Sequence, residues 1–225
     1  MRRSTINRLL EEAVDLLEKW NFALPPFAFW TPEEWQKKGP ECDEIRRNAL
    51  GWDITDFGLG DFENNGVLLF TIRNGNPADP EGSKPYCEKI IISRPDQKCL
   101  LHFHWQKVED IINRAGGDLV LRLYGSDEAE QVDRANTVTV SLDGVRTEVA
   151  AGGLVRLCSG ESICLEPGMY HEFWAEGEPT LIGEVSAVND DASDNRFAEP
   201  VGRFPEIEED EPILYYLCNE YPPAR

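Results

Sequence analysis

The sequence contains no apolar run that approaches the roughly 20 residues of a membrane-spanning helix. It also lacks an export signal, because Met1-Arg2-Arg3 is followed by a mixed charged segment instead of an apolar one. The six cysteines include no CxxC pair, which favours free thiols over a disulfide framework in a chain of this length. We therefore expect a cytoplasmic protein without a membrane partner.

Basic residues are scarce as well. There are 22 lysines and arginines against 42 aspartates and glutamates, so the formal net charge is -20. A chain this acidic repels phosphate groups, which argues against nucleic acid as a partner. The charge itself is expected mainly to keep the protein soluble.

The first 52 residues predict a helical extension. Apolar residues at three- and four-residue steps predict a helix over residues 4–20, which Ser4 or Thr5 is able to cap. A T-x-x-E capping box that starts at Thr31 predicts a second, short helix. Further helical turns are expected near residues 42–50.

Short runs with turn residues between them predict strands from about residue 54 onwards. The clearest signal is Asp143-Gly144, which separates two such runs and predicts a two-residue hairpin. The predicted strands cover residues 67–73, 87–93, 98–105, 118–124, 138–142, 145–149, 154–158, 162–166, 171–175, 180–188 and 213–218. Strands at roughly ten-residue spacing indicate a sandwich or a closed barrel. We expect one all-β domain over residues 53–225, with residues 1–52 packed on it.

Histidine is rare too: the 225 residues contain three, in two short segments. His102 and His104 lie two apart on a predicted strand, so both rings point the same way. Glu109 follows five residues later, which requires the chain to turn or Glu109 to open the next strand. His171 comes directly after a turn that contains proline and glycine. We predict that these four residues bind one divalent metal ion, and such a mixed set suits manganese, iron, nickel, cobalt or zinc.

The spacing of these residues resembles the two motifs of the cupin superfamily. The first motif reads HxH, four residues, E, six residues, G, and the second ends in PxGxxH, three residues, N. The residues at the matching positions are His102, His104, Glu109, Gly116, Gly168 and His171. The chain departs from the pattern at Asp96, where the first motif begins with glycine, and at Ala175, where the second ends with asparagine. The resemblance implies a jelly-roll β-barrel.

Within that superfamily, the whole chain resembles the D-lyxose isomerases. The similarity covers the N-terminal helix, the run 107–113, and the tail runs 194–197 and 203–210. The resemblance implies a manganese-dependent aldose–ketose isomerase that interconverts D-lyxose and D-xylulose, and often D-mannose and D-fructose. Such enzymes transfer a proton between C1 and C2 through a metal-bound cis-enediolate. They are usually cytoplasmic homodimers.

This chemistry requires a base and a proton donor near the metal. Lys107, three residues after His104, is the candidate donor. It is otherwise a solvated lysine at a strand end. For the base we prefer Glu206, in the family-like tail, over Glu184, with Asp190 or another acid as a further option. Glu206 also begins an acidic run, and such runs are usually solvated surface.

Four residues are candidates for sugar binding. Trp105 and Trp174 flank metal ligands in sequence and are able to line a sugar pocket, although a tryptophan in a β-barrel is more often core. Asp190 lies in a polar loop that is able to bind hydroxyl groups. Arg203 either grips a sugar hydroxyl or forms an ion pair with a neighbouring acid.

Two other functions remain open at this point. The same barrel and ligands also suit a metal-dependent dioxygenase, with iron in the site and dioxygen at one open position. A non-catalytic, metal-bound sugar-binding cupin is the third possibility. Turnover of a pentose without oxygen would favour the isomerase over both.

Overall fold

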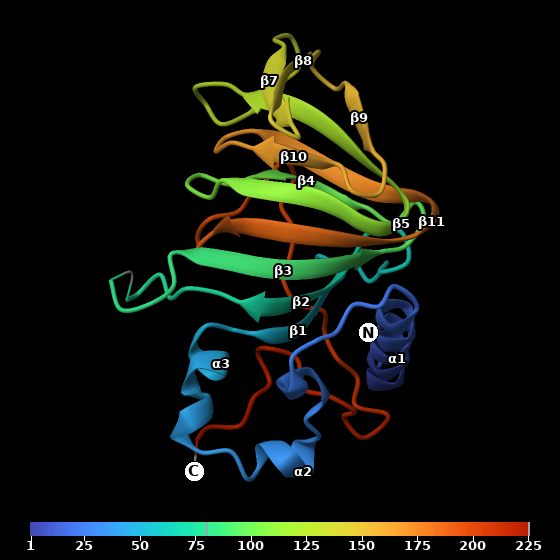
Figure 1. Ribbon diagram of the computed structural model, residues 1–225, viewed down its shortest axis with the longest axis vertical. Helices are drawn as coiled ribbons and strands as arrows, with labels where there is room; N and C mark the ends of the chain where they lie inside the picture. The colour runs from blue at the N-terminus through green and yellow to red at the C-terminus, as the bar shows by residue number, and fades with distance from the viewer. Residues whose placement is uncertain (80, 225) are drawn as a thin grey trace.

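The computed structural model describes residues 1–79 and 81–224, and in these residues helices precede a large antiparallel sheet (Figure 1). The helical segments are α1 (Arg3–Lys19), η1 (Pro26–Phe29), α2 (Pro32–Trp35), η2 (Pro40–Cys42) and α3 (Asp43–Arg47). The strands are β1 (Gly51–Thr55), β2 (Val67–Arg73), β3 (Tyr86–Ser93), β4 (Cys99–Phe103), β5 (Glu109–Ser126), β6 (Val132–Asp133), β7 (Val138–Leu142), β8 (Val145–Val149), β9 (Leu154–Leu157), β10 (Ser162–Leu165), β11 (Tyr170–Ala187) and β12 (Arg196–Phe197).

The two longest strands, β5 and β11, organise the barrel. The strand order is β1-β2-β3-β11-β5-β10-β7-β8, with β4 paired to β11 and β12, and with β6 and β9 paired to β5. Strand β11 pairs with β5 along its length, and its other neighbour changes from β4 near His171 to β3 after Thr180. The all-β cupin jelly roll with an N-terminal helical segment is therefore confirmed.

A bulge lets β5 and β11 bend where the neighbour changes. The register between the two strands shifts between Glu176 and Thr180, opposite Gly116. Gly116 has a φ of 95°, and a Cβ atom there would lie 2.0 Å from the carbonyl oxygen of Pro179. Only glycine fits this position. Asp96 stands at the start of the same motif with a φ of 63°, a conformation that aspartate tolerates better than most residues.

Most of the predicted elements are confirmed. The helix over 4–20 is α1, and the capping box at Thr31 is present with both of its hydrogen bonds. The helix α1 begins differently from the prediction, because neither Ser4 nor Thr5 caps it: the N-cap residue is Arg2, with no side-chain bond. The Asp210 carboxylate instead accepts hydrogen bonds from the Ser4 backbone and hydroxyl at 2.9 and 2.7 Å.

Four strand predictions need correction. The predicted strand over 118–124 is the second half of β5, and those over 171–175 and 180–188 are the two halves of β11. The strand over 213–218 is wrong, because this segment forms only an isolated bridge between Leu217 and Trp52. Strand β1 was not predicted. The division of the chain at residue 52 stays a prediction, and β1 spans this point.

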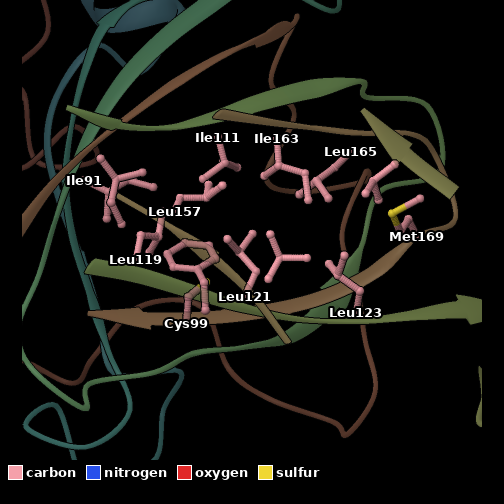
Figure 2. Packing of buried hydrophobic residues seen from close by; sticks show 14 of the residues in the cluster. Ile91, Cys99, Ile111, Leu119, Leu121, Leu123, Leu157, Ile163, Leu165 and Met169 are labelled. Carbon is pink, nitrogen blue, oxygen red and sulfur yellow. The ribbon is translucent and has the colours of Figure 1, made fainter. Parts of the chain in front are cut away.

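Two hydrophobic cores fill the molecule, one inside the barrel and one beneath α1. Inside the barrel, Leu119, Leu121 and Leu123 point inward at every second residue of β5 and pack on other strands (Figure 2). Beneath α1, the apolar helix face packs on the outer side of β1, β2 and β3. Part of the inner core, including Phe57 and Phe173, lines the cavity into which the three histidines also project.

The N-terminus is tied to the C-terminal tail: in Figure 1 the N label lies beside α1, and the red tail runs below β1. The backbone N–H of Arg3 donates to Glu208 and the N–H of Glu208 donates to Met1, each at 2.9 Å. The guanidinium of Arg3 is fully buried and forms ion pairs with Glu209 and Glu220. The tail residues just before this clamp include Arg203, so the clamp helps to place that side chain.

The Arg3 clamp gives a prediction about stability. Arg3→Met should lower the free energy of unfolding by about 2 kcal/mol, because Glu220 is mostly buried and loses a charged partner. Arg2→Met is the matched control. Its ion pair with Glu208 is exposed on both sides, so the expected change is below about 0.5 kcal/mol. Urea unfolding of both variants measures the difference, and equal effects would contradict the structural role of Arg3.

No helix within residues 1–79 and 81–224 has the length and apolar character needed to cross a membrane. The six cysteines are free.

Candidate metal centre and active site

The three histidines meet because β4 and β11 are neighbours. His102 is on β4, His104 follows the end of that strand, and His171 is the second residue of β11, where it pairs in register with His102. The ring centroids are 4.2 Å apart for His102 and His171 and 5.0 Å apart for His102 and His104. One nitrogen from each ring lies within 4.8 Å of the others. All three side chains are buried.

Backbone carbonyl groups fix the orientation of each ring. The Nδ1 atoms of His102, His104 and His171 lie 2.7, 2.7 and 3.0 Å from the carbonyl oxygens of Leu100, Asp194 and Met169. A carbonyl oxygen only accepts, so Nδ1 must carry the hydrogen, which leaves a lone pair on Nε2. The Nε2 atoms of His104 and His171 are buried without a hydrogen-bond partner. Such unpartnered, converging nitrogens fit a metal ion.

Glu109 completes this set of donors. It is the first residue of β5, and its Oε1 atom lies 3.0 Å from Nε2 of His171 and 3.4 Å from Nε2 of His104. Burial alone would raise the pKa of Glu109, but the Lys107 ammonium holds it well below the ordinary value. Burial also lowers the pKa of His102, helped by the other two rings. Three neutral nitrogens and one carboxylate suit a divalent transition metal.

A row of alternating charges extends from Glu109 into the barrel. The Nζ atom of Lys107 lies 2.7 Å from Oε2 of Glu109 and 2.9 Å from Oε1 of Glu184. The same oxygen of Glu184 lies 3.2 Å from Nζ of Lys89. Each of these four residues is 2–4% exposed. Buried charges cost free energy even when paired, so such a row in a cavity indicates a functional site.

These neighbours keep the row charged. Burial would lower the pKa of Lys107 and of Lys89, but the carboxylates beside them raise both pKa values. Burial would raise the pKa of Glu184, and the two lysines lower it. The site therefore holds ionised ammonium and carboxylate groups in contact at neutral pH.

Asp194 shapes the turn that presents Lys107. Its carboxylate accepts hydrogen bonds from the backbone N–H groups of Gln106 and Lys107 at 2.8 and 2.9 Å. Its carbonyl is the one that orients His104. Nearby Phe197, on β12, stacks on the His102 ring with centroids 5.3 Å apart. The segment after β11 thus helps to fix the positions of His102, His104 and Lys107.

One cavity contains the proposed ligands and the row of charges. Its polar lining also includes Asp191 and Arg203, and its apolar lining includes Phe57, Phe173 and Phe197. The Arg203 guanidinium forms ion pairs with Asp53 and, at 2.9 Å, with Asp191. Burial would raise the pKa of Asp191, but Lys89 and Arg203 hold it below the ordinary value. A small polyhydroxylated molecule fits such a lining of mixed charges and aromatic rings.

Comparison with known proteins decides the family. A family model described as D-lyxose isomerase matches residues 1–221. The chain belongs to the D-lyxose isomerase family. Two proteins named D-lyxose/D-mannose isomerase, from Serratia proteamaculans and Escherichia coli O157:H7, are each 46% identical over 98% of both chains. The chain is therefore a sugar isomerase, and the predicted family and enzyme class are confirmed.

Solved structures agree on the fold of this D-lyxose isomerase family member. The L-ribose isomerase of Cellulomonas parahominis, without ligand, superposes with a TM-score of 0.59 at 16% identity. The match covers 92% of this chain and 98% of the other. At this identity the similarity shows the fold alone.

Several predicted site residues of this family member line the cavity. Lys107, Glu184 and Arg203 do so together with the four proposed metal ligands. Glu109 opens β5, which was one of the two expected ways to turn it toward the histidines. The roles of all these residues remain proposals, although the structure brings them together.

The preference for Glu206 as the base must be corrected. Glu206 is exposed and does not line the cavity, and its carbonyl oxygen accepts a hydrogen bond from the Met1 ammonium group. The physical reason is the N-terminal clamp, which holds this part of the tail beside α1 instead of over the barrel mouth. Glu184, the second choice, lines the cavity, where it lies beside Lys107.

Trp105, Trp174 and Asp190 also lie outside the cavity lining. Trp105 is 41% exposed, and its indole N–H donates to Glu130 at 2.9 Å. Trp174 is three residues after His171 and so faces away from the barrel interior, where its N–H donates to Glu176. The Asp190 carboxylate accepts from the backbone N–H groups of its own loop. Sugar binding by these three residues has no support from their positions.

Lys89, Asn189, Asp191 and Asp194 belong to the site but were not predicted. Lys89 could have been predicted from the sequence, because it lies two residues before Ile91 and so shares the inner face of a strand that is otherwise largely apolar. The other three lie in one polar loop after β11, where the sequence offers several acids and no rule for choosing among them.

Proposed function

We propose that this sugar isomerase interconverts D-lyxose and D-xylulose, and D-mannose and D-fructose, with Mn²⁺ as its native cofactor. The observation that carries the proposal is the convergence of three histidine nitrogens with the Glu109 carboxylate, beside the row of charges formed by Lys107 and Glu184. The relatives named D-lyxose/D-mannose isomerase support this choice of sugars.

His102, His104, Glu109 and His171 would hold the metal ion. A bound divalent cation supplies electrostatic stabilisation of negative charge that develops on neighbouring oxygens. The remaining chemistry falls to the side chains beside it, because isomerisation also moves one proton between two carbon atoms.

Lys107 and Glu184 are the residues that we assign to proton transfer. Glu184 is ionised and faces the cavity, so it is able to take the proton from C2 of the aldose and return it to C1. A second proton must pass from O2 to O1. Lys107 is charged and lies beside Glu184, so it is able to give a proton to O1, where charge develops, and to take one back from the O2 hydroxyl. The two groups are 2.9 Å apart, so a move of the ammonium toward the substrate directly affects the basicity of Glu184.

Arg203 and Asp191 are the residues that we assign to the hydroxyl groups of the sugar. Both line the cavity, and their ion pair offers donors and acceptors side by side. Phe57, Phe173 and Phe197 also line the cavity, and their apolar rings would limit the water beside a bound sugar. The dioxygenase and the non-catalytic sugar-binding protein lose their support, because the family is one of isomerases.

The test uses the purified protein after chelation and dialysis. With D-lyxose, the metal-free protein should be inactive, and added Mn²⁺ should restore the formation of D-xylulose, also without oxygen. NMR should show that the new hydrogen at C1 of D-xylulose comes either from C2 of D-lyxose or from the solvent. An absence of turnover with Mn²⁺ and every common aldose would overturn the proposal. If another divalent ion restored more activity than Mn²⁺, only the assignment of manganese as the native metal would be overturned.

Glu184→Gln tests the assignment of the base. The variant keeps the shape of the side chain but cannot accept the proton, so kcat should fall by about 10³ while the bound manganese remains. Glu178→Gln, an exposed change in the bend of the same strand, is the control and should retain full activity. Metal analysis and steady-state kinetics measure both, and wild-type kcat in Glu184→Gln would assign the base elsewhere.

The homodimer and the cytoplasmic location remain predictions from the resemblance and the sequence. Light scattering coupled to gel filtration measures the assembly, with a mass of about twice 25.5 kDa expected.

A further inference from the structure

Lys89 is the one buried lysine of the site to which the proposed mechanism gives no task. It lies on β3 directly across from Glu184 on β11, and the two residues are partners in the strand register. Its Nζ atom lies 3.2 Å from Oε1 of Glu184, and the residue is 4% exposed. Rigid paired strands therefore carry both groups, so this contact does not depend on a loop.

Lys107, in contrast, serves two carboxylates and precedes β5 in a turn. Its ammonium lies within 2.9 Å of both Glu109 and Glu184. If it turns to a substrate oxygen, its contact with Glu184 weakens. The Glu184 carboxylate, which is 4% exposed, would then depend on Lys89 for its counter-ion at the moment when it must act as a base.

We propose that Lys89 is a positioning residue that holds the Glu184 carboxylate in place and balances its charge while Lys107 acts on the substrate. The inference rests on the proposed function, because it assumes that Glu184 transfers the proton. The lysine on the strand is the permanent partner of Glu184, and the lysine on the turn is the exchangeable one.

Asn189 accepts a further hydrogen bond from the ammonium group of each lysine. Its Oδ1 atom accepts from Nζ of Lys89 at 2.6 Å and from Nζ of Lys107 at 3.4 Å. The backbone of Asn189 is itself held by Asn74 through two reciprocal hydrogen bonds of 3.0 Å each. Asn48 in turn donates to the carbonyl of Asn74. This row of asparagines helps to hold the Lys89 ammonium against Glu184 at the wall of the cavity.

The experiment is a double-mutant cycle between Lys89 and Glu184, in holoenzyme loaded with Mn²⁺. Lys89→Met should lower kcat by about 10- to 100-fold, with KM within threefold of wild type and unchanged manganese content. Lys89→Arg should recover most of the rate, because it restores the charge. In the Glu184→Gln background, Lys89→Met should change kcat by less than threefold. Lys37→Met, at an exposed lysine outside the barrel, is the control.

A second readout does not depend on activity. Lys89→Met should lower Tm by at least about 4 °C, because it leaves a buried carboxylate with one partner fewer. In the Glu184→Gln background the same change should cost less than half as much. If Lys89→Met does not fold, Lys89→Gln takes its place in both backgrounds.

The outcomes separate the two proposals. Equal effects of Lys89→Met on kcat and Tm in both backgrounds would overturn the coupling to Glu184. A KM raised more than tenfold with unchanged kcat would make Lys89 a substrate-binding residue, which also overturns the inference. If the wild-type protein isomerises no sugar, the proposed function fails on its own, and the Tm cycle still reports whether Lys89 positions Glu184.

Discussion

Replacing His171 with alanine is expected to remove the bound manganese and to lower kcat/KM for D-lyxose by at least about 10³. His171 is 1% exposed, and its Nε2 atom has no hydrogen-bond partner while it points at Glu109. It also faces His102 across two paired strands, so its loss opens the side of the site that β11 supplies. Metal analysis after dialysis and steady-state kinetics on the same sample measure both effects.

The matched control for this variant is Glu172→Gln. Glu172 is the next residue on β11, so its side chain points to the opposite face, where it pairs with Arg122. This variant should keep its metal and its rate. Full manganese content in His171→Ala would remove His171 from the ligand set and would leave the site with three protein ligands.

Changing Lys107 to methionine is expected to lower kcat by about 10³ without loss of the metal. The two effects separate because Lys107 contacts the Oε2 atom of Glu109, while Oε1 is the atom that faces the histidines. Removal of this positive charge also favours a cation beside Glu109, so the affinity for Mn²⁺ should stay equal or increase. Titration of the chelated variant with Mn²⁺ measures the affinity, and saturating D-lyxose measures kcat.

Lys98→Met is the control for Lys107→Met. Lys98 is exposed and directly precedes β4, the strand that carries His102, so the change removes a lysine close by in the chain and should leave kcat unchanged. If Lys107→Met lost its manganese together with its rate, the role of Lys107 would be to shape the turn before Glu109 rather than to act on the substrate.

The convergence of the four proposed metal ligands could be predicted because it depends on local spacing. Two histidines two residues apart on a strand share a face whatever the rest of the fold does, and Glu109 had only two ways to reach them. The β-barrel could be predicted equally well, since turn residues recur at regular intervals in the sequence. The full length of β5 and β11 could not be predicted, because the bulge opposite Gly116 divides each continuous strand into two short apolar patterns.

The residues around the metal could not be predicted for a different reason. Whether Glu206 or Glu184 enters the cavity depends on where the tail docks, and this is set by contacts more than 200 residues apart in the chain, such as Arg3 with Glu209. The choice between Asp190 and Asp191 depends on a single loop conformation. Pairings between distant segments leave no periodic pattern in the sequence.

The clamp at the N-terminus has a practical consequence for work on the protein. The free amine of Met1 donates to the tail at Glu206, three residues after the arginine of the cavity. A purification tag fused ahead of Met1 would convert that amine into an amide and crowd the docked tail, whereas Ala224 near the other end is exposed. Tags are therefore better placed at the C-terminus, and low activity in N-terminally tagged preparations should be checked against the untagged enzyme.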